Sequence, residues 1–546
     1  MPPPRPNVAP AFDVFLPSDP ILIDSSSPLH TPAWVAALSE YPGDLPRLIH
    51  GILTHGARIG YDGPEQIIIS RNLPIDESDF AFLDAKTTAD EKAGLISRAT
   101  PSFPFVSSPL GVVPKHDGGR RRIHHLSYPT GSSVNNFIDQ SRGTLSYTTF
   151  DEILFSIGQA GRGCILIKRD IRDAFRMIPV SALQRWLLGF SWRSVFYQEH
   201  ALPFGLRTAP FIFNLFAEAL HWILIFRGWP TLHHYLDDFI TILSPNHAEW
   251  DTPNISRRWI QITDELGIPR KESKDEQGTT VNILGIEVDS LAMEARLPLE
   301  KLVRLRNKIV SLLQVGKCTL CTIESLAGLL SFCSRVVRLG RIFTQSSFEF
   351  IAHIHQAHRG GLFPLPRNLI DDLHWWLRLL EDFNGVRILD DSIRPTSIAF
   401  TDASSDGLGG YILVNGGPID PRFAFSTRPK PALRRQHINT KEAAAALRVF
   451  QKWGADLRGH RLIFYTDSAT VYSGITKGST RAQARCQIRD LLLIAARMDI
   501  VIDCSWIPGK ENSLADALSR MDAAYIAENY ANLLQVLPTR NLPPPS

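Results

Sequence analysis

The sequence has few cysteines, almost no net charge and no hydrophobic run long enough to cross a membrane. Six cysteines in 546 residues, with no signal-peptide pattern, predict a reduced intracellular protein, in the cytoplasm or the nucleus, without structural disulfides. The most apolar window, Phe211 to Phe226, is interrupted by Asn214, Glu218 and His221, so no membrane partner is expected. Because the net charge is only +3, any affinity for a polyanion must come from locally clustered basic residues.

The composition is that of a globular protein with several domains. With 44% hydrophobic and 21% charged residues, a chain of 546 residues is expected to hold about three or four domains of roughly 150 residues each. Residues 1–30 are rich in Pro and Ser, and the chain closes with Asn-Leu-Pro-Pro-Pro-Ser, so both ends are predicted to be disordered. Residues 31–100 show short helical patches and are predicted to form a loosely packed N-terminal extension.

Two adjacent carboxylates lie between two apolar, β-prone runs in residues 233–243. This pattern predicts a hairpin that carries Asp237 and Asp238 at its tip. Because successive strand side chains point to opposite faces, both carboxylates reach one site only where a tight turn breaks the alternation. Such a pair suits a divalent metal ion, whereas most isolated Asp-Asp pairs are ordinary turns.

A further carboxylate ends an apolar strand. Residues 164–170 predict a buried strand that ends at Asp170, and a carboxylate there is costly unless it is paired or bound to a metal. Phe175, shortly afterwards, fits two interpretations. It is either simple core or the aromatic floor of a nucleotide site, packed where a ribose 2′-hydroxyl would otherwise lie.

Basic residues gather on another short hairpin. In residues 111–126 an Asp-Gly-Gly turn separates two short strands, with Lys115 on one side and Arg120, Arg121 and Arg122 on the other. Arg binds phosphate oxygens bidentately and Lys acts as a point charge, so the hairpin suits a triphosphate. A solvated basic hairpin and a generic nucleic-acid patch are the alternatives.

A turn, a long helix and a second hairpin complete this part of the chain. At Pro203-Phe204-Gly205 the backbone can approach a ligand or template closely, because Gly has no Cβ. The pattern then predicts an amphipathic helix over residues 211–227. Strand-like runs at 266–269 and 283–288, around a charged loop, predict a further hairpin of the sheet that holds Asp237.

From Pro298 to Leu380 the pattern is helical and the charges are mainly positive. A charge run is usually a solvated helix face, but a sustained positive sign fits contact with a phosphate backbone equally well. The basic residues of this run are Lys301, Arg304, Arg306, Lys308, Lys317, Arg335, Arg338 and Arg341.

The last folded part, from about Pro395, alternates strands and helices. Its order of strand, strand, helix, strand, helix, strand, helix predicts an α/β domain. Two strands end in carboxylates and two helices carry carboxylates, which can converge at one edge of the sheet. Asn512 lies four residues before Asp516, the last of these carboxylates, on the same helix face. The four carboxylates are Asp402, Glu442, Asp467 and Asp516.

Together, residues 107–520 resemble a reverse transcriptase followed by a ribonuclease H domain, as in retrotransposons of the LTR gypsy type or the DIRS type. The resemblance implies a multidomain α/β and α+β fold, a right-hand polymerase of fingers, palm and thumb followed by a ribonuclease H-like α/β domain. It implies fingers and palm at 101–290, a helical thumb and connection at 291–394, a ribonuclease H-like domain at 395–522 and a C-terminal tail at 523–546.

The resemblance also implies roles for individual residues. The catalytic and metal-binding residues it implies are Asp170, Asp237, Asp238, Asp402, Glu442, Asp467 and Asp516. Those implied for dNTP and template binding are Lys115, Arg121, Arg122, Phe175 as the gate against ribonucleotides, Pro203, Phe204, Gly205, Tyr235 and Lys274, with Lys271 as a rival to Lys274. Two Mg²⁺ ions per active site are expected, with Mn²⁺ as the alternative, and the expected partners are an RNA template, a DNA primer, an RNA–DNA hybrid and dNTPs.

Some expected features are missing from the sequence. Many ribonucleases H carry a mobile His before the last acidic helix, and residues 507–514 contain none, so product release or metal exchange is expected to differ. No Asp-Thr-Gly or Asp-Ser-Gly protease signature and no His-His-Cys-Cys zinc module is present, so no protease or integrase is expected in this chain. The alternative to an active enzyme is a catalytically inactive or domesticated retroelement remnant that binds nucleic acid. The sequence does not set the oligomeric state.

Overall fold

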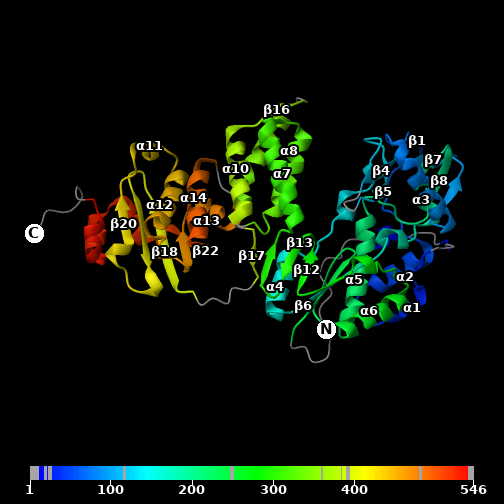
Figure 1. The fold of residues 1–546 in the computed structure, drawn as a ribbon, viewed down its shortest axis with the longest axis horizontal. Coiled ribbons are helices and arrows are strands. Elements are labelled where there is room, and N and C mark those ends of the chain that lie inside the picture. Colours follow the sequence, from blue (N-terminus) through cyan, green and yellow to red (C-terminus); the bar gives the residue numbers. More distant parts are fainter. Residues whose placement is uncertain are drawn as a thin grey trace, which may run out of the picture. The chain divides into compact units, whose positions relative to one another are not determined.

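The computed structural model describes residues 12–16, 21–22, 27–114, 118–245, 251–337, 339–357, 361–382, 384–388, 394–478 and 482–538. The chain divides into two compact units, residues 1–293 and 294–546, each a mixture of helices and sheets (Figure 1). The disorder predicted for the two ends falls mostly outside the described residues. The finer division into six segments stays a prediction.

A four-stranded antiparallel sheet with the strand order β11-β6-β10-β9 lies at the centre of the first unit. Its strands are β6 (Ile165–Asp170), β9 (Leu232–Tyr235), β10 (Asp238–Leu243) and β11 (Glu276–Gly278). Helix α5 (Ala209–Phe226) packs against β9, and helix α4 (Phe150–Ala160) packs against β10. Because helices cover this sheet, β10 is apolar and buried after its first residue.

Helix α5 confirms the helix predicted over residues 211–227. The expectation that no hydrophobic run is long enough to cross a membrane is wrong, because α5 is long and apolar enough by length and composition. However, 72% of it is buried inside the protein. Its side chains fill the main core of the first unit, where Phe213, Phe216 and Ile223 are at most 1% exposed. The apolar character of α5 is therefore that of a core helix.

The loose packing predicted for residues 31–100 is wrong. Helices α1 (Thr31–Ala37) and α2 (Leu45–His55) pack into the main core of the first unit, and Trp34 is fully buried. The Trp34 ring packs edge-on against Phe216, and its Nε1 donates a hydrogen bond to the carbonyl oxygen of Leu266 at 3.0 Å. The apolar stripe of α2 has helical spacing, which fixes its buried face at Leu45, Leu48, Ile49, Ile52 and Leu53.

A second sheet and the basic hairpin lie in the same unit. The sheet has the order β1-β3-β7-β8-β2, with β1 (Ile67–Ile69), β3 (Phe105–Ser107), β7 (Gly189–Trp192), β8 (Val195–Glu199) and β2 (Ile96–Ala99). The predicted basic hairpin is confirmed, because β4 (Leu110–Pro114) pairs with β5 (Arg120–His124). Helix α3 (Phe80–Lys92), β4 and β7 share one small core through Leu83, Leu110 and Phe190.

The hairpin predicted from the runs at 266–269 and 283–288 is wrong. Leu266 is the last residue of helix α6 (Thr252–Leu266), and Gly267 caps that helix in the left-handed conformation, with φ +74°. Strands β12 (Thr280–Ile283) and β13 (Ile286–Asp289) pair with each other outside the central sheet. The charged segment between the runs supplies β11 to the central sheet instead.

The second unit begins with four helices, as the pattern after Pro298 predicts. They are α7 (Leu299–Val315), α8 (Leu320–Cys333), α9 (Gln345–Ala357) and α10 (Arg367–Asp382). Strand β14 (Glu294–Arg296) pairs antiparallel with β17 (Val386–Arg387), and β15 (Lys317–Cys318) pairs antiparallel with β16 (Phe363–Pro364). Ile309, Leu330 and Trp376 are fully buried, so α7, α8 and α10 share a dry core.

The C-terminal part of the second unit is a five-stranded sheet of order β20-β19-β18-β21-β22, which carries helices α12 and α14 beside it (Figure 1). Its strands are β18 (Thr396–Ala403), β19 (Leu408–Leu413), β20 (Ala424–Thr427), β21 (Arg461–Thr466) and β22 (Val501–Trp506). Its helices are α11 (Pro431–Arg434), α12 (Ile438–Trp453), α13 (Ala469–Lys477), α14 (Arg485–Arg497) and α15 (Ser513–Arg520). The predicted α/β alternation is confirmed, but the sequence interpretation missed β20 and α11. The single helix predicted between β21 and β22 is two helices, α13 and α14.

The segment that follows α15 packs on this domain. Helix α16 (Ala523–Asn529) and the 3-10 turn η13 (Ala531–Val536) bury Ile526 and Leu533 against Leu518 of α15. The start of the predicted C-terminal tail is therefore part of the folded unit. The final Pro-rich residues lie beyond the described range.

Candidate active sites

The Asp-Asp segment forms the predicted hairpin in the central sheet. Tyr235 ends β9 and Asp238 begins β10, opposite each other, so Leu236 and Asp237 form a two-residue turn. Leu236 adopts φ +51°, which is the left-handed conformation that such a tight turn requires. On its other side, Asp238 lies directly opposite Asp170 of β6. Three carboxylates from two strand ends and a turn thus meet at one edge of the sheet.

The electrostatics of this edge are dominated by burial and by nearby cations. Asp170 is 5% exposed, and the Nζ of Lys274 lies 3.0 Å from its Oδ2. Burial, and then the neighbouring carboxylates Asp237 and Asp170, raise the pKa of Asp238 to about 6, against the opposing effects of Lys168 and Lys274. Burial also raises the pKa of Asp237. Excess negative charge is therefore concentrated here and only partly offset by these lysines.

The geometry separates the two rival lysines. Burial lowers the pKa of Lys274, but its hydrogen bond to Asp170 and the nearby carboxylates outweigh burial, so the pKa is raised and the ammonium stays charged. Lys271 instead donates its backbone N–H to the Asp170 carbonyl oxygen at 3.1 Å. Its side chain lines the cavity but makes no ion pair with Asp170 among the described residues.

A cavity of about 630 Å³ opens in front of these carboxylates. Arg121 projects from β5 with its guanidinium carbon 5.1 Å from the centroid of the Phe204 ring, a cation–π distance. The Phe204 ring in turn lies 5.1 Å from that of Phe175. Asp170 and Asp237 line the same cavity, so it brings together a free guanidinium, an aromatic wall and two carboxylates.

The Pro-Phe-Gly turn lies where its backbone comes close to β5. Gly205 has φ +107°, and a Cβ on it would overlap the carbonyl oxygen of His124, so only Gly fits this position. Asn135 holds the turn by donating to the Gly205 carbonyl at 2.8 Å and accepting from the backbone N–H of Arg207 at 2.9 Å. Pro203 before it is buried and lines the cavity.

Two further predicted binding residues make contacts within the protein. The side chain of Arg122, which also lines the cavity, is 8% exposed and forms ion pairs with Asp90 at 2.8 Å and Glu199 at 3.2 Å. Tyr235 stacks on Tyr147 with ring centroids 4.7 Å apart. Lys115 lies outside the described residues. All the roles assigned to single residues in this cavity stay predictions, and Arg122, like Lys274, is already paired with protein carboxylates.

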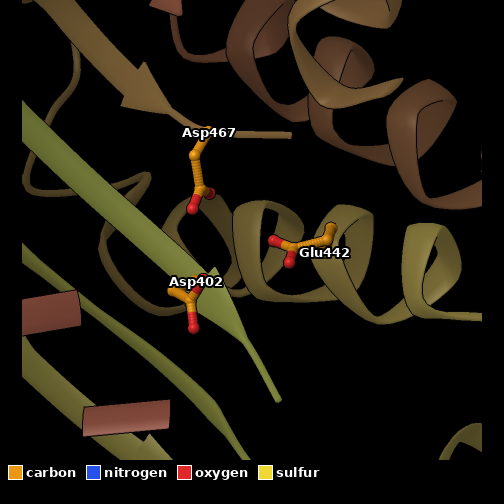
Figure 2. Close-up of side chains that lie close together, drawn as sticks. All are labelled: Asp402, Glu442 and Asp467. Carbon is orange, nitrogen blue, oxygen red and sulfur yellow. The ribbon is translucent and has the colours of Figure 1, made fainter. Parts of the chain in front are cut away.

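In the second unit, three of the four predicted carboxylates converge. Each of Asp402, Glu442 and Asp467 offers an oxygen, and these oxygens lie within 4.8 Å of one another. Figure 2 shows the three side chains directed at a common point from β18, from α12 and from the end of β21. Among the described residues this is the one group of three or more His, Cys, Asp or Glu side chains that is so tight; the carboxylates of the first unit are spaced more widely.

This triad fits a cation. Glu442 Oε2 and Asp467 Oδ1 are buried and have no hydrogen-bond partner within the described chain. Burial raises the pKa of Asp402 to about 6, and burial together with the charges of Asp402 and Asp467 raises the pKa of Glu442 to about 9. A metal ion among these oxygens would satisfy both orphaned atoms and offset the repulsion, which makes the triad a candidate metal site.

The fourth predicted carboxylate lies outside the close group. Asp516 accepts a hydrogen bond from Arg520 Nε, one helical turn on, at 2.6 Å, and its side chain is 41% exposed. Asn512 before it is 2% exposed, and its Nδ2 donates to the carbonyl oxygen of Thr401 at 2.9 Å. Asn512 thus fixes the start of α15 to the residue before Asp402, a tie that the sequence does not reveal.

Comparison with known families agrees with both sites. Residues 113–288 match the family described as reverse transcriptase (RNA-dependent DNA polymerase). Residues 393–492 match the RNase H-like domain found in reverse transcriptases. The chain therefore contains a reverse transcriptase domain followed by an RNase H-like domain. The fold class predicted from the sequence, a mixed α/β multidomain reverse transcriptase fold with a C-terminal RNase H-like domain, is confirmed.

Individual relatives are distant and longer. An enzymatic polyprotein of Cassava vein mosaic virus is 21% identical over 476 residues, which cover 81% of this chain and 63% of the relative. The enzymatic polyprotein of Cauliflower mosaic virus (strain CM-1841) is 23% identical over 371 residues, which cover 64% of this chain and 49% of the relative. The chain thus spans about half to two thirds of the length of these polyproteins.

Solved structures that match this chain include enzymes of foamy virus. A foamy viral protease-reverse transcriptase in complex with double-stranded DNA has a TM-score of 0.47 and 14% identity, covering 89% of this chain and 84% of that one. The same kind of protein in complex with an RNA/DNA hybrid has a TM-score of 0.46 and 15% identity, covering 82% and 57%.

Proposed function

We propose that this chain is an RNA-directed DNA polymerase with ribonuclease H activity from a retrotransposon. In this proposal it copies RNA into DNA and degrades the RNA strand of the resulting hybrid. The observation that carries the proposal is the presence of two separate groups of carboxylates, each with one buried and two half-buried members: Asp170 with Asp237 and Asp238, and Asp402 with Glu442 and Asp467. Each group lies in a domain whose family carries out one of the two reactions.

In the polymerase site, Asp170, Asp237 and Asp238 would hold Mg²⁺ or Mn²⁺. Two such ions, when bound, lower the pKa of the primer 3′-hydroxyl and neutralise the leaving pyrophosphate. The protein itself supplies positioning and charge. Arg121 presents its guanidinium at the cavity for phosphate oxygens, and the ring of Phe175 fills the side of the cavity that would face the sugar of the incoming dNTP.

In the ribonuclease H site, Asp402, Glu442 and Asp467 would hold the ions, with Asp516 as the fourth carboxylate. Ions bound there would supply an activated water as the nucleophile and would stabilise the leaving oxygen. Asp516 pairs with Arg520 on the partly exposed side of α15, between the buried residues Ala515 and Ala517.

The partners of the proposal are an RNA template, a DNA primer, their hybrid and dNTPs. Binding of the duplex is expected to be independent of sequence and to weaken with salt, because Lys and Arg contact backbone phosphates. In α7, Arg304 is exposed, whereas Arg306 pairs with Glu381 at 2.5 Å and the Lys308 Nζ donates to Ser325. We therefore expect Arg304 to contribute more to duplex binding than Arg306 or Lys308.

The source and location belong to the same proposal. From the resemblance of its motifs, the proposed source of the protein is an element of the LTR gypsy type or the DIRS type. Its proposed place of action is the cytoplasm or the nucleus. The competing proposal is an inactive remnant that only binds nucleic acid. In an inactive remnant, selection no longer keeps the metal ligands from being substituted. Every predicted carboxylate is present in this sequence, which favours the active enzyme.

The test is primer extension on an RNA template with dNTPs and Mg²⁺. Wild-type protein is compared with the double variant Asp237→Asn, Asp238→Asn and with Asp456→Asn, a control at an exposed aspartate. We expect extension by the wild type and the control, and none by the double variant. Binding of the hybrid without extension by any of the three proteins would favour the remnant.

A further inference from the structure

Four largely buried charged side chains of the cavity wall, Asp90, Arg122, Arg176 and Glu199, are linked by ion pairs. Asp90 also pairs with Lys86, whose Nζ lies 2.8 Å from its Oδ1. Glu199 of β8 accepts from Arg176 Nη1 at 2.6 Å and from Arg122 Nη2 at 3.2 Å. Arg122 Nη2 also lies 2.8 Å from Asp90 Oδ2, and Arg176 Nη2 lies 3.7 Å from the same oxygen. None of the four side chains is more than 8% exposed.

The two arginines of this network each neighbour a residue of the cavity. Arg122 follows Arg121 in β5, and because strand side chains alternate, fixing one face of the strand fixes the other. Arg176 follows Phe175 within the short 3-10 turn η5 (Ala174–Met177), so anchoring it holds the turn that carries the ring. The network therefore grips the two elements that project a guanidinium and an aromatic ring into the cavity.

The contacts close into a ring through the cavity wall. Arg121 lies over Phe204, and Phe204 packs on Phe175. Glu199 joins the strand of Arg121 to the turn of Phe175 through one carboxylate with two occupied oxygens. A shift of either element thus has to break a charge-assisted hydrogen bond between largely buried groups, which is costly.

We propose that Glu199 is a positioning residue that holds Arg121 and Phe175 in one fixed arrangement, so that dNTP affinity and discrimination against ribonucleotides depend on it together. This inference rests on the proposed polymerase function and on the roles assigned there to Arg121 and Phe175. Asp90 does not contact the two arginines equally. It contacts Arg122 closely and Arg176 only at 3.7 Å, so it supports the Arg121 side of the cavity more than the Phe175 side.

The test measures two parameters in the full-length protein: KM for dNTP and the ratio of dNTP to rNTP incorporation. Glu199→Gln keeps the size of the side chain and removes its charge. Since misplacing a positioning group by 1 Å can cost about 100-fold, we expect a partial loosening to raise KM about tenfold and to lower discrimination about tenfold. Asp90→Asn is expected to raise KM and to leave discrimination near that of the wild type.

Controls separate positioning from general destabilisation. Glu65→Gln changes an exposed glutamate of the same unit, and cleavage of a preformed hybrid by the RNase H-like domain reports on intact protein. If Glu199→Gln lowers kcat and melting temperature while KM and discrimination stay unchanged, Glu199 is merely structural and the inference is overturned. If this variant does not fold, the unequal effect of Asp90→Asn decides the matter, and equal changes in both parameters would overturn the inference.

Two double variants test the route of the effect. In an Arg121→Ala background, Glu199→Gln should no longer raise KM, and in a Phe175→Ala background it should no longer lower discrimination. Full additivity in both backgrounds would overturn the inference. Failure of the proposed function is a different result: wild-type protein then shows no extension, and equilibrium binding of dNTP to the enzyme–hybrid complex, which needs no turnover, replaces KM as the measurement.

Discussion

The metal-free RNase H-like domain is predicted to lose stability as the pH rises, because of Glu442. The pKa of this side chain rises from 4.5 to about 9 through burial and the charges of Asp402 and Asp467. The folded state therefore binds this proton more tightly than the unfolded state. The stability tied to that proton is fully present below pH 4.5 and is lost as the pH rises through about 9, a total of about 6 kcal/mol at 1.36 kcal/mol per pH unit.

Between pH 7 and 8.5 this effect can be isolated. Asp402, with a pKa of about 6, is already ionised in this range, so Glu442 dominates the slope. We expect the free energy of unfolding in EDTA to fall by about 2 kcal/mol over the interval. Glu442→Gln removes the titrating group, so its unfolding free energy should stay nearly level. Mg²⁺ should stabilise the wild type more at pH 8.5 than at pH 7, because metal binding has to release the proton.

The assay is thermal and urea unfolding of the full-length protein at several pH values, followed by calorimetry, with and without Mg²⁺. Asp456→Asn, at an exposed position, serves as the isosteric control and should follow the wild-type slope. An equal pH slope for Glu442→Gln and the wild type would refute the reasoning, since the slope is then due to other groups.

Three further substitutions have distinct expected outcomes. Asn512→Ala removes the buried tie to the Thr401 carbonyl, so hybrid cleavage should fall while primer extension is unchanged, at a cost of about 1–3 kcal/mol in unfolding free energy. Asp372→Ala leaves Arg489 buried without its partner and should lower the unfolding free energy of the second unit by about 3–5 kcal/mol, measured by urea titration. Thr149→Ala breaks the capping box of α4 and should cost about 1 kcal/mol, measured by the melting temperature, without loss of activity.

Local patterns account for what the sequence predicted correctly. The hairpin of Asp237 and the strand ending in Asp170 are each encoded within a few residues, by β-prone runs bounded by a turn or a charge. The same holds for Asp402 and Asp467, which lie at the ends of apolar strands. The parallel pairing of these two strands then brings their ends to one edge of the sheet.

Long-range contacts account for the features that the sequence does not predict. The network of Asp90, Arg122, Arg176 and Glu199 joins four elements, and its ion-paired residues lie 23 to 86 residues apart in the sequence. No local signal distinguishes its members from surface charges. The hairpin wrongly placed in the central sheet has the same cause. Its apolar runs are equally consistent with a helix end and with a separate sheet, and only tertiary packing decides between them.

The apolar pattern of residues 31–100 indicates that these residues are buried in a core. The apolar residues of α2 recur at helical spacing, and Trp34 is a large side chain that needs a core. Short helices of this kind form only when a neighbouring surface covers their apolar face. The surface is supplied by α5 and α6, whose positions the local pattern does not give.

The measurement that tests the central claim most directly follows a labelled primer and a labelled RNA template in one reaction. Wild type, the double variant Asp237→Asn, Asp238→Asn, and Asp402→Asn are compared. Two independent carboxylate sites predict that the wild type extends and cleaves, that the first variant only cleaves a preformed hybrid, and that the second only extends. Loss of both reactions in either variant, with the protein still folded, would contradict two separate active sites.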